Sequence, residues 1–144
     1  MKVLVVGGAG YIGSHMVKML HGLGHEVVTL DNLVGGFEDA VTGGEFVQGD
    51  LNDPAGLDDL FSQHQFDGVM HFASYIQVGE SVKDPGKYYQ NNVANTLNLL
   101  DTMVKHEVKA FIFSSTAAIF GEPEYVPIDE KHQRNICVIT TGLA

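Results

Sequence analysis

The chain has 144 residues, 44% of them hydrophobic, and a formal net charge of −10 from 8 basic and 18 acidic side chains. A chain of this length can bury roughly two-thirds of its unfolded surface, which is enough for one core. The acidic balance argues against nucleic acid and anionic membranes as partners, because both need a basic face. No apolar run approaches the roughly 18 residues of a membrane span, and the chain opens on its first strand, so we expect no signal peptide. The single cysteine, Cys137, favours a reducing, cytoplasmic location.

The first expected element is a buried strand over about residues 2–6, and a glycine-rich turn follows it directly. Gly7, Gly10 and Gly13 lead into a helical pattern over about residues 11–23. Glycines in such a turn permit a tight strand-to-helix connection, approach of backbone N–H groups to a pyrophosphate, and close packing of helix on strand. An ordinary turn is the alternative. The position between a strand and a helix favours a dinucleotide site, with the phosphates at the helix N-terminus.

A second apolar strand, over about residues 26–30, ends at Asp31, eighteen residues beyond Gly13. An acidic residue about 20 residues past the glycines accepts hydrogen bonds from the adenosine ribose hydroxyls and repels a 2′-phosphate. No arginine precedes Arg134, so no guanidinium near Asp31 in sequence could neutralise that phosphate. Asp31 could instead open the turn that continues through Asn32. The pattern predicts NAD rather than NADP as cofactor.

Strand and helix patterns continue to alternate along the chain. We expect a short third strand over residues 45–48, a helix capped by Asp53 and Pro54 that runs to about His64, a fourth strand over residues 68–72, a long helix over residues 87–105 and a fifth strand over residues 110–114. Repeated βα units predict the α/β class, with a Rossmann-like, doubly wound parallel sheet and helices on both faces.

In such a sheet, ligands bind outside the carboxyl ends of the strands. The residues that follow strands two to five are therefore candidate cofactor contacts: Asp31, Asn32, Asp50, Leu51, Phe72, Ala73, Ser74 and Ser114. Asp50 could accept from an adenine amino group while Leu51 covers the ring, although Asp50 could also be a turn residue. The small residues Ala73 and Ser74 would let the backbone pass close to the dinucleotide, and a hydroxyl among residues 114–116 would lie beside the nicotinamide.

The histidines give no metal motif. His21 and His25 are four residues apart, but Gly22 and Gly24 break the helix that would aim them together. His71, at a strand end, is interpreted as a packed or hydrogen-bonded core residue rather than a catalyst. We therefore expect no metal site.

Four segments together resemble the extended short-chain dehydrogenase/reductase family: residues 7–15 (GGAGYIGSH), 30–33 (LDNL), 49–51 (GDL) and 71–74 (HFAS). Four more are similar to the branch of that family that interconverts UDP-glucose and UDP-galactose: residues 78–82, 88–93, 111–116 and 129–132. The similarity covers residues 1–132, which we expect to form an NAD-binding Rossmann domain. Residues 133–144 depart from the family pattern.

The resemblance implies an isomerase that holds NAD tightly, oxidises a nucleotide sugar at C4 and reduces it from the other face. Within it, Thr116 matches a hydroxyl that assists the catalytic base, and Tyr11, Ile12 and Asn91 match cofactor contacts. Ile76 stands where many relatives carry a lysine near the cofactor phosphates.

The family's catalytic Tyr-x-x-x-Lys is missing, since none of the five tyrosines has a lysine four residues later. The family's sugar-binding domain is absent as well, a break that resembles a frameshift or truncation more than divergence. We therefore expect this chain to bind NAD without epimerising, and to self-associate or dimerise through an uncovered edge at strand five. Another nucleotide-sugar epimerase or dehydratase, and an NAD-binding module without chemistry, remain alternatives.

Overall fold

The structure is a computed structural model that describes residues 1–121 and 123–133. The chain forms two compact units. Residues 1–74 and 95–114 make the first unit, and residues 75–94 together with the residues from 115 onward make the second. All but the first residue of the tail expected over residues 133–144 lies outside the described residues.

The first unit contains a five-stranded sheet in which every pairing is parallel. Its order is β3-β2-β1-β4-β5, with β1 in the middle. The strands are β1 (Lys2–Val6), β2 (Glu26–Asp31), β3 (Glu45–Gln48), β4 (Gly68–His71) and β5 (Ala110–Phe113). The predicted parallel, Rossmann-like sheet is confirmed, and each strand lies within one residue of its expected bounds.

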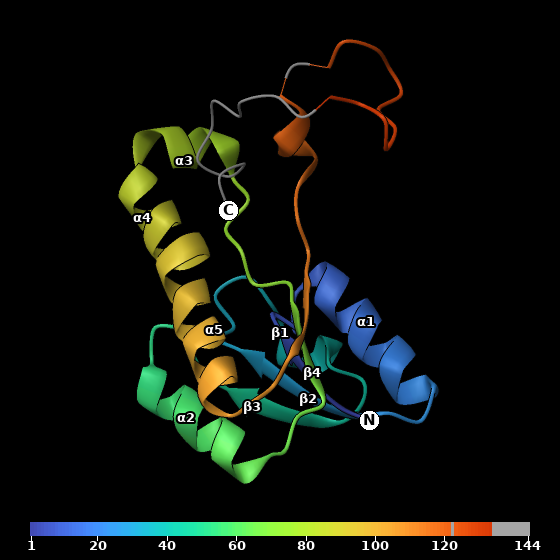
Figure 1. The fold of residues 1–144 in the computed structure, drawn as a ribbon, viewed down its shortest axis with the longest axis vertical. Coiled ribbons are helices and arrows are strands. Elements are labelled where there is room, and N and C mark those ends of the chain that lie inside the picture. Colours follow the sequence, from blue (N-terminus) through green and yellow to red (C-terminus); the bar gives the residue numbers. More distant parts are fainter. Residues whose placement is uncertain (122, 134–144) are drawn as a thin grey trace. The chain divides into compact units, whose positions relative to one another are not determined.

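Three helices and a 3-10 turn accompany this sheet: α1 (Tyr11–Gly22), η1 (Glu38–Ala40), α2 (Pro54–Gln63) and α5 (Asn95–Lys105). Helix α1 lies on one face of the sheet, and α2 and α5 lie on the other (Figure 1). The start of α2 follows the sequence prediction, because Asp53 is its N-cap, accepts a hydrogen bond from the Gly56 N–H at 3.1 Å, and is followed by Pro54.

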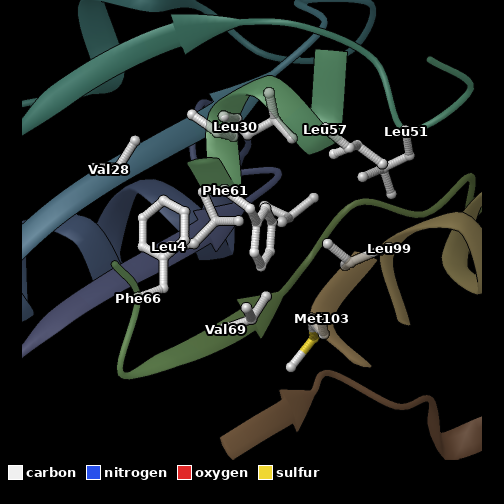
Figure 2. Close-up of a cluster of buried hydrophobic side chains, with 12 residues drawn as sticks. Leu4, Val28, Leu30, Leu51, Leu57, Phe61, Phe66, Val69, Leu99 and Met103 are labelled. Atoms are coloured by element: carbon white, nitrogen blue, oxygen red, sulfur yellow. The ribbon is translucent and has the colours of Figure 1, made fainter. Parts of the chain in front are cut away.

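Alternate residues of β1 enter two different hydrophobic clusters, because successive side chains of a strand point to opposite faces. Leu4 and Val6 belong to the cluster shared with α2 and α5, where Leu57, Phe61 and Leu99 meet the sheet (Figure 2). Val3 and Val5 belong to the cluster shared with α1, whose contributions are Val17 and Leu20. Burial on both faces explains why the first strand is continuously apolar from Val3 to Val6 rather than alternating.

The second unit contains α3 (Val78–Lys83), α4 (Pro85–Tyr89), the π-helical segment η2 (Gln90–Ala94) and a 3-10 turn, η3 (Ala117–Phe120). The single helix expected over residues 87–105 is thus wrong: the chain forms α4, η2 and α5 in succession. Helix α4 begins earlier than expected because Asp84 caps it, accepting from the Lys87 N–H at 3.2 Å, with Pro85 at its first position. No helix in the described part of the chain is both long and apolar enough to cross a membrane.

Candidate functional site

The loops that follow the strands of the first unit are joined to neighbouring strands by backbone hydrogen bonds. The Gly7 N–H donates to Leu30 O at 2.8 Å, and the Phe72 N–H donates to Val6 O at 2.8 Å. The Ser114 N–H continues the series at the next strand, donating to His71 O at 3.0 Å. The predicted cofactor residues of the first unit therefore do gather along one edge of the sheet, as parallel strands require.

The glycines of the loop over residues 7–13, called the glycine loop below, differ in whether an added side chain would collide with the protein backbone. A Cβ on Gly7, whose φ is +77°, would lie 2.6 Å from the Ala73 nitrogen, and a Cβ on Gly13 would collide with the Gly7 carbonyl oxygen. A Cβ on Gly10 would meet only that same carbonyl oxygen, at 3.3 Å. Gly7 and Gly13 are therefore required by the fold itself, whereas Gly10 leaves open space that a ligand can use.

Helix α1 offers an uncapped N-terminus beside this loop. Gly10 is its N-cap and so supplies no capping side chain, and its first turn contains no acidic residue. The first N–H groups of a helix have no acceptor inside the helix, and together with the helix dipole they favour an anion. Tyr11 and Ile12, the first two helical residues, are 83% and 59% exposed. The geometry at this point suits a phosphate group.

Asp31 links the glycine loop to the loop after β2. One carboxylate oxygen accepts from the Ala9 N–H at 3.0 Å, and the other accepts from the Leu33 N–H at 2.8 Å. Leu33 has a φ of +61°, in the left-handed region, and its bond to Asp31 holds it there. Asp31 therefore does stabilise the turn after β2, which was the alternative role considered for it from the sequence. Each oxygen keeps a further lone pair, so this role leaves acceptor capacity for a ribose hydroxyl.

Asp50 and Leu51 follow β3 and differ in their surroundings. The exposed Asp50 carboxylate accepts from the Asn32 side-chain amide at 2.8 Å and from the Asn52 N–H at 2.8 Å. Leu51 is 7% exposed and packs in the core cluster beneath α2 and α5. Little of the Leu51 side chain is exposed, so little of it could cover an adenine ring. Its main role in this structure is core packing.

His71 is buried at the end of β4, with 1% of its surface exposed. Its Nδ1 accepts from the Ala73 N–H at 3.3 Å, which places the ring proton on Nε2, 3.2 Å from the Thr96 hydroxyl oxygen. Burial lowers the pKa of His71 from 6.5 to about 4. The ring is therefore neutral and structural near pH 7, which confirms the core interpretation of His71.

Asn91 and Thr116 belong to the second unit, whereas the strand-end residues belong to the first. Asn91 lies in η2 and donates its side-chain amide to the Asn92 side-chain oxygen at 2.9 Å. Thr116 precedes η3, and its carbonyl oxygen accepts from the Ile119 N–H at 3.3 Å.

Asn92 is a structural residue that the sequence reasoning missed. It is 3% exposed, accepts from the Tyr75 N–H at 2.9 Å and donates to the Tyr75 carbonyl oxygen at 3.0 Å. A pair of adjacent asparagines in a helical pattern was the available signal, because asparagine is a poor residue for a helix interior. Among the described residues, no three His, Cys, Asp or Glu side chains lie close enough together to hold a metal ion.

The chain is similar in sequence and in fold to known proteins. Residues 3–137 match the model of the NAD dependent epimerase/dehydratase family. The chain is 51% identical over 131 residues to a UDP-glucose 4-epimerase of Halalkalibacterium halodurans, covering 91% of this chain but 39% of that protein. One UDP-glucose 4-epimerase crystal structure has a TM-score of 0.94 and 48% identity, covering 99% of this chain and 44% of that one. The Brucella ovis enzyme, solved in complex with NAD, has a TM-score of 0.92 and 45% identity, covering 99% and 43%.

Proposed function

The chain belongs to the NAD dependent epimerase/dehydratase family, and from that membership we propose that it binds NAD along the carboxyl edge of its sheet. The observation that carries the proposal is the Asp31 carboxylate, fixed by the Ala9 and Leu33 N–H groups between the glycine loop and the loop after β2. A carboxylate held at this place suits the ribose hydroxyls of NAD and disfavours the 2′-phosphate of NADP.

The proposed roles follow the cofactor from one end to the other. The glycine loop and the N-terminus of α1 hold the pyrophosphate, Asp31 holds the adenosine ribose, and Asp50 accepts from the adenine amino group. Ala73, Ser74 and Ser114, at the ends of β4 and β5, lie toward the nicotinamide. The residues proposed to form the cofactor-binding site are Gly7, Gly10, Tyr11, Ile12, Gly13, Asp31, Asn32, Asp50, Leu51, Phe72, Ala73, Ser74, Asn91 and Ser114.

For a full-length protein that contains this chain, we propose interconversion of UDP-glucose and UDP-galactose through transient oxidation of the sugar at C4. The high identity to UDP-glucose 4-epimerases supports this assignment, and the chain spans about two-fifths of their length. Thr116 is the proposed catalytic hydroxyl. These 144 residues contain no tyrosine followed four residues later by lysine, so we propose that the chain alone binds NAD without epimerising.

For the 144 residues taken alone, a second candidate is an NAD-binding module without chemistry, because they contain no such tyrosine–lysine pair. We further propose a cytoplasmic location and self-association. Self-association is supported by β5, which pairs with β4 alone in the described residues and leaves Ile112 55% exposed. Sedimentation of the purified chain at several concentrations tests this, and a monomer at all of them would refute self-association.

Calorimetric titration with NAD and with NADP tests the cofactor assignment. NAD should bind more tightly, and Asp31→Ala should weaken NAD binding by about 1–3 kcal/mol, because ribose hydroxyls lose their acceptor. Gly10→Val should abolish NAD binding while the far-UV circular dichroism stays intact, because its added side chain enters space that the fold leaves empty. Equal affinity for NAD and NADP, or full binding by Gly10→Val, would contradict the proposal.

A separate assay tests the proposal that the chain alone does not epimerise UDP-galactose. The purified chain should bind NAD and show no conversion of UDP-galactose above background, since no base is placed to take the proton of the 4-hydroxyl. Turnover of UDP-galactose at a rate normal for an epimerase would overturn the claim that the chain alone is inactive.

A further inference from the structure

Asn32 makes an interaction that its position in sequence did not reveal. Its side-chain amide donates to Asp50 Oδ2 at 2.8 Å, across the ends of two neighbouring strands. The other end of the same side chain accepts from the Val34 N–H at 3.1 Å, which fixes the amide orientation. Asn32 therefore connects the loop after β2 to the residue that follows β3.

This connection determines how the Asp50 carboxylate is presented. Asp50 is exposed, and an exposed aspartate without partners samples several rotamers. Here one oxygen is held by Asn32 and the other by the Asn52 N–H at 2.8 Å, so the plane of the carboxylate is fixed from both sides. Each oxygen retains a lone pair for one further donor.

The two loops are also joined through their backbones, since the Gly49 N–H donates to Asp31 O at 3.1 Å. This backbone hydrogen bond holds the loop that carries Asn32 in place beside the loop that carries Asp50. The Asn32 amide uses one of its two N–H groups on Asp50 and one oxygen lone pair on the Val34 N–H, and these two contacts fix its orientation.

We propose that Asn32 is a positioning residue that orients the Asp50 carboxylate toward the exocyclic amino group of a bound adenine, and so contributes to base specificity. This inference rests on the proposed NAD site. A carboxylate held in one orientation loses less conformational freedom when it binds a donor, so its contribution to affinity rises. Asn32 acts through Asp50 and does not need to contact the cofactor.

The test compares two ligands on the 144-residue chain: NAD, and an NAD analogue whose adenine is replaced by unsubstituted purine, which lacks the 6-amino group. We expect Asn32→Ala to weaken NAD binding about tenfold and to leave binding of the purine analogue within about twofold. A general structural defect would weaken both ligands alike. The matched control is Asn52→Ala, which removes a nearby amide side chain but keeps the backbone N–H that Asp50 accepts.

A double-mutant cycle completes the test. In an Asp50→Ala background, Asn32→Ala should have no further effect on NAD affinity, because its only route to the ligand is gone. Equal losses for NAD and the purine analogue, or an additive loss in the double variant, would overturn the positioning role. Absence of any NAD binding by the unmutated chain would instead refute the proposed function, so the two failures are distinguishable. Thermal unfolding of each variant confirms that it is folded.

Discussion

Buried side chains in the first unit are mainly aliphatic and aromatic, whereas those of the second unit, among the described residues, all carry polar atoms: Ser81, Tyr88, Asn92 and His132. Tyr88 shows the pattern of the second unit. It is 1% exposed, and its hydroxyl donates to a Glu80 carboxylate oxygen at 2.8 Å. Lys87 pairs with the other oxygen at 2.7 Å, and these two hydrogen bonds hold the pKa of Glu80 below its usual range.

This difference between apolar and polar buried side chains determines which substitutions each unit can tolerate. Apolar packing depends on volume and is spread over many contacts, so conservative exchanges cost little. A buried polar group depends on individual donors and acceptors, so loss of one partner leaves the other unsatisfied. The first unit should therefore respond to cavities, and the second should respond to deletion of single hydrogen-bonding groups.

The largest expected effect is a cavity in the first unit. Leu99 in α5 is 0% exposed and belongs to the main core cluster, so Leu99→Ala should lower the free energy of unfolding by about 2–5 kcal/mol. Leu97→Ala is the matched control on the same helix, because Leu97 is 54% exposed and should change stability by about 0.5 kcal/mol or less. Urea unfolding measures both. Similar losses for the two leucines would contradict the packing account of the first unit.

The second prediction concerns His71, one of the buried polar residues of the first unit. His71 has a pKa of about 4 when folded and 6.5 as its ordinary value, so the unfolded chain binds a proton first as the pH falls. Its contribution to stability is complete above pH 6.5 and is lost as the pH falls toward 4, by about 3 kcal/mol in total. Urea unfolding from pH 7 to pH 4 should show this loss beyond that of His71→Gln, which does not titrate. Parallel pH profiles for the two proteins would refute it.

In the second unit, Asn92→Ala should lower stability by about 1–3 kcal/mol, because it leaves both polar groups of the Tyr75 backbone without their side-chain partner. We expect the loss to be local, so that hydrogen exchange speeds up in residues 75–94 while the strands keep their protection. Asn91→Ala is the neighbouring control, since the bonds between Asn92 and Tyr75 remain. Faster exchange throughout β1 would show that the second unit does not respond separately.

The smallest expected effect is a gain. Thr29 in β2 is 0% exposed, and its hydroxyl oxygen has no hydrogen-bond partner in the described part of the chain. Thr29→Val replaces this hydroxyl with a methyl group of similar size and should stabilise the protein by about 1 kcal/mol. Thermal unfolding would show a raised midpoint, and a lowered midpoint would mean that the hydroxyl has a stabilising role.

Much of the first unit was predictable because its signals are local. The apolar run of β1, the glycines that follow it and the acid at the end of β2 occur in a fixed order along the sequence, which can be recognised without knowledge of long-range contacts. The caps of α2 were predictable for the same reason. Asp31 was predicted to be a site residue from its position at the end of a strand, whereas its bonds to Ala9 and Leu33 required the folded structure.

What could not be predicted depends on contacts between residues that are separated in sequence or too few to form a pattern. The Asn32–Asp50 hydrogen bond joins two loops that only the sheet brings together. Helix α3 has six residues, among them a glycine and two valines, so no periodic pattern could indicate it. The π-helical segment η2 is associated with Asn92, whose buried bonds to Tyr75 do not follow from helix propensity.

The central position of β1 has a consequence for the order in which the protein folds as it is synthesised. Its pairing with β2 can form once the first 31 residues are available, but its other edge stays open until β4 emerges and pairs through residues 68–71. The bonds between Lys2 and Asp67, at 2.7 and 2.8 Å, likewise join the start of the chain to a segment made much later. A nascent chain therefore exposes an apolar strand edge during this interval, and a chaperone that covers extended apolar segments would act most usefully then.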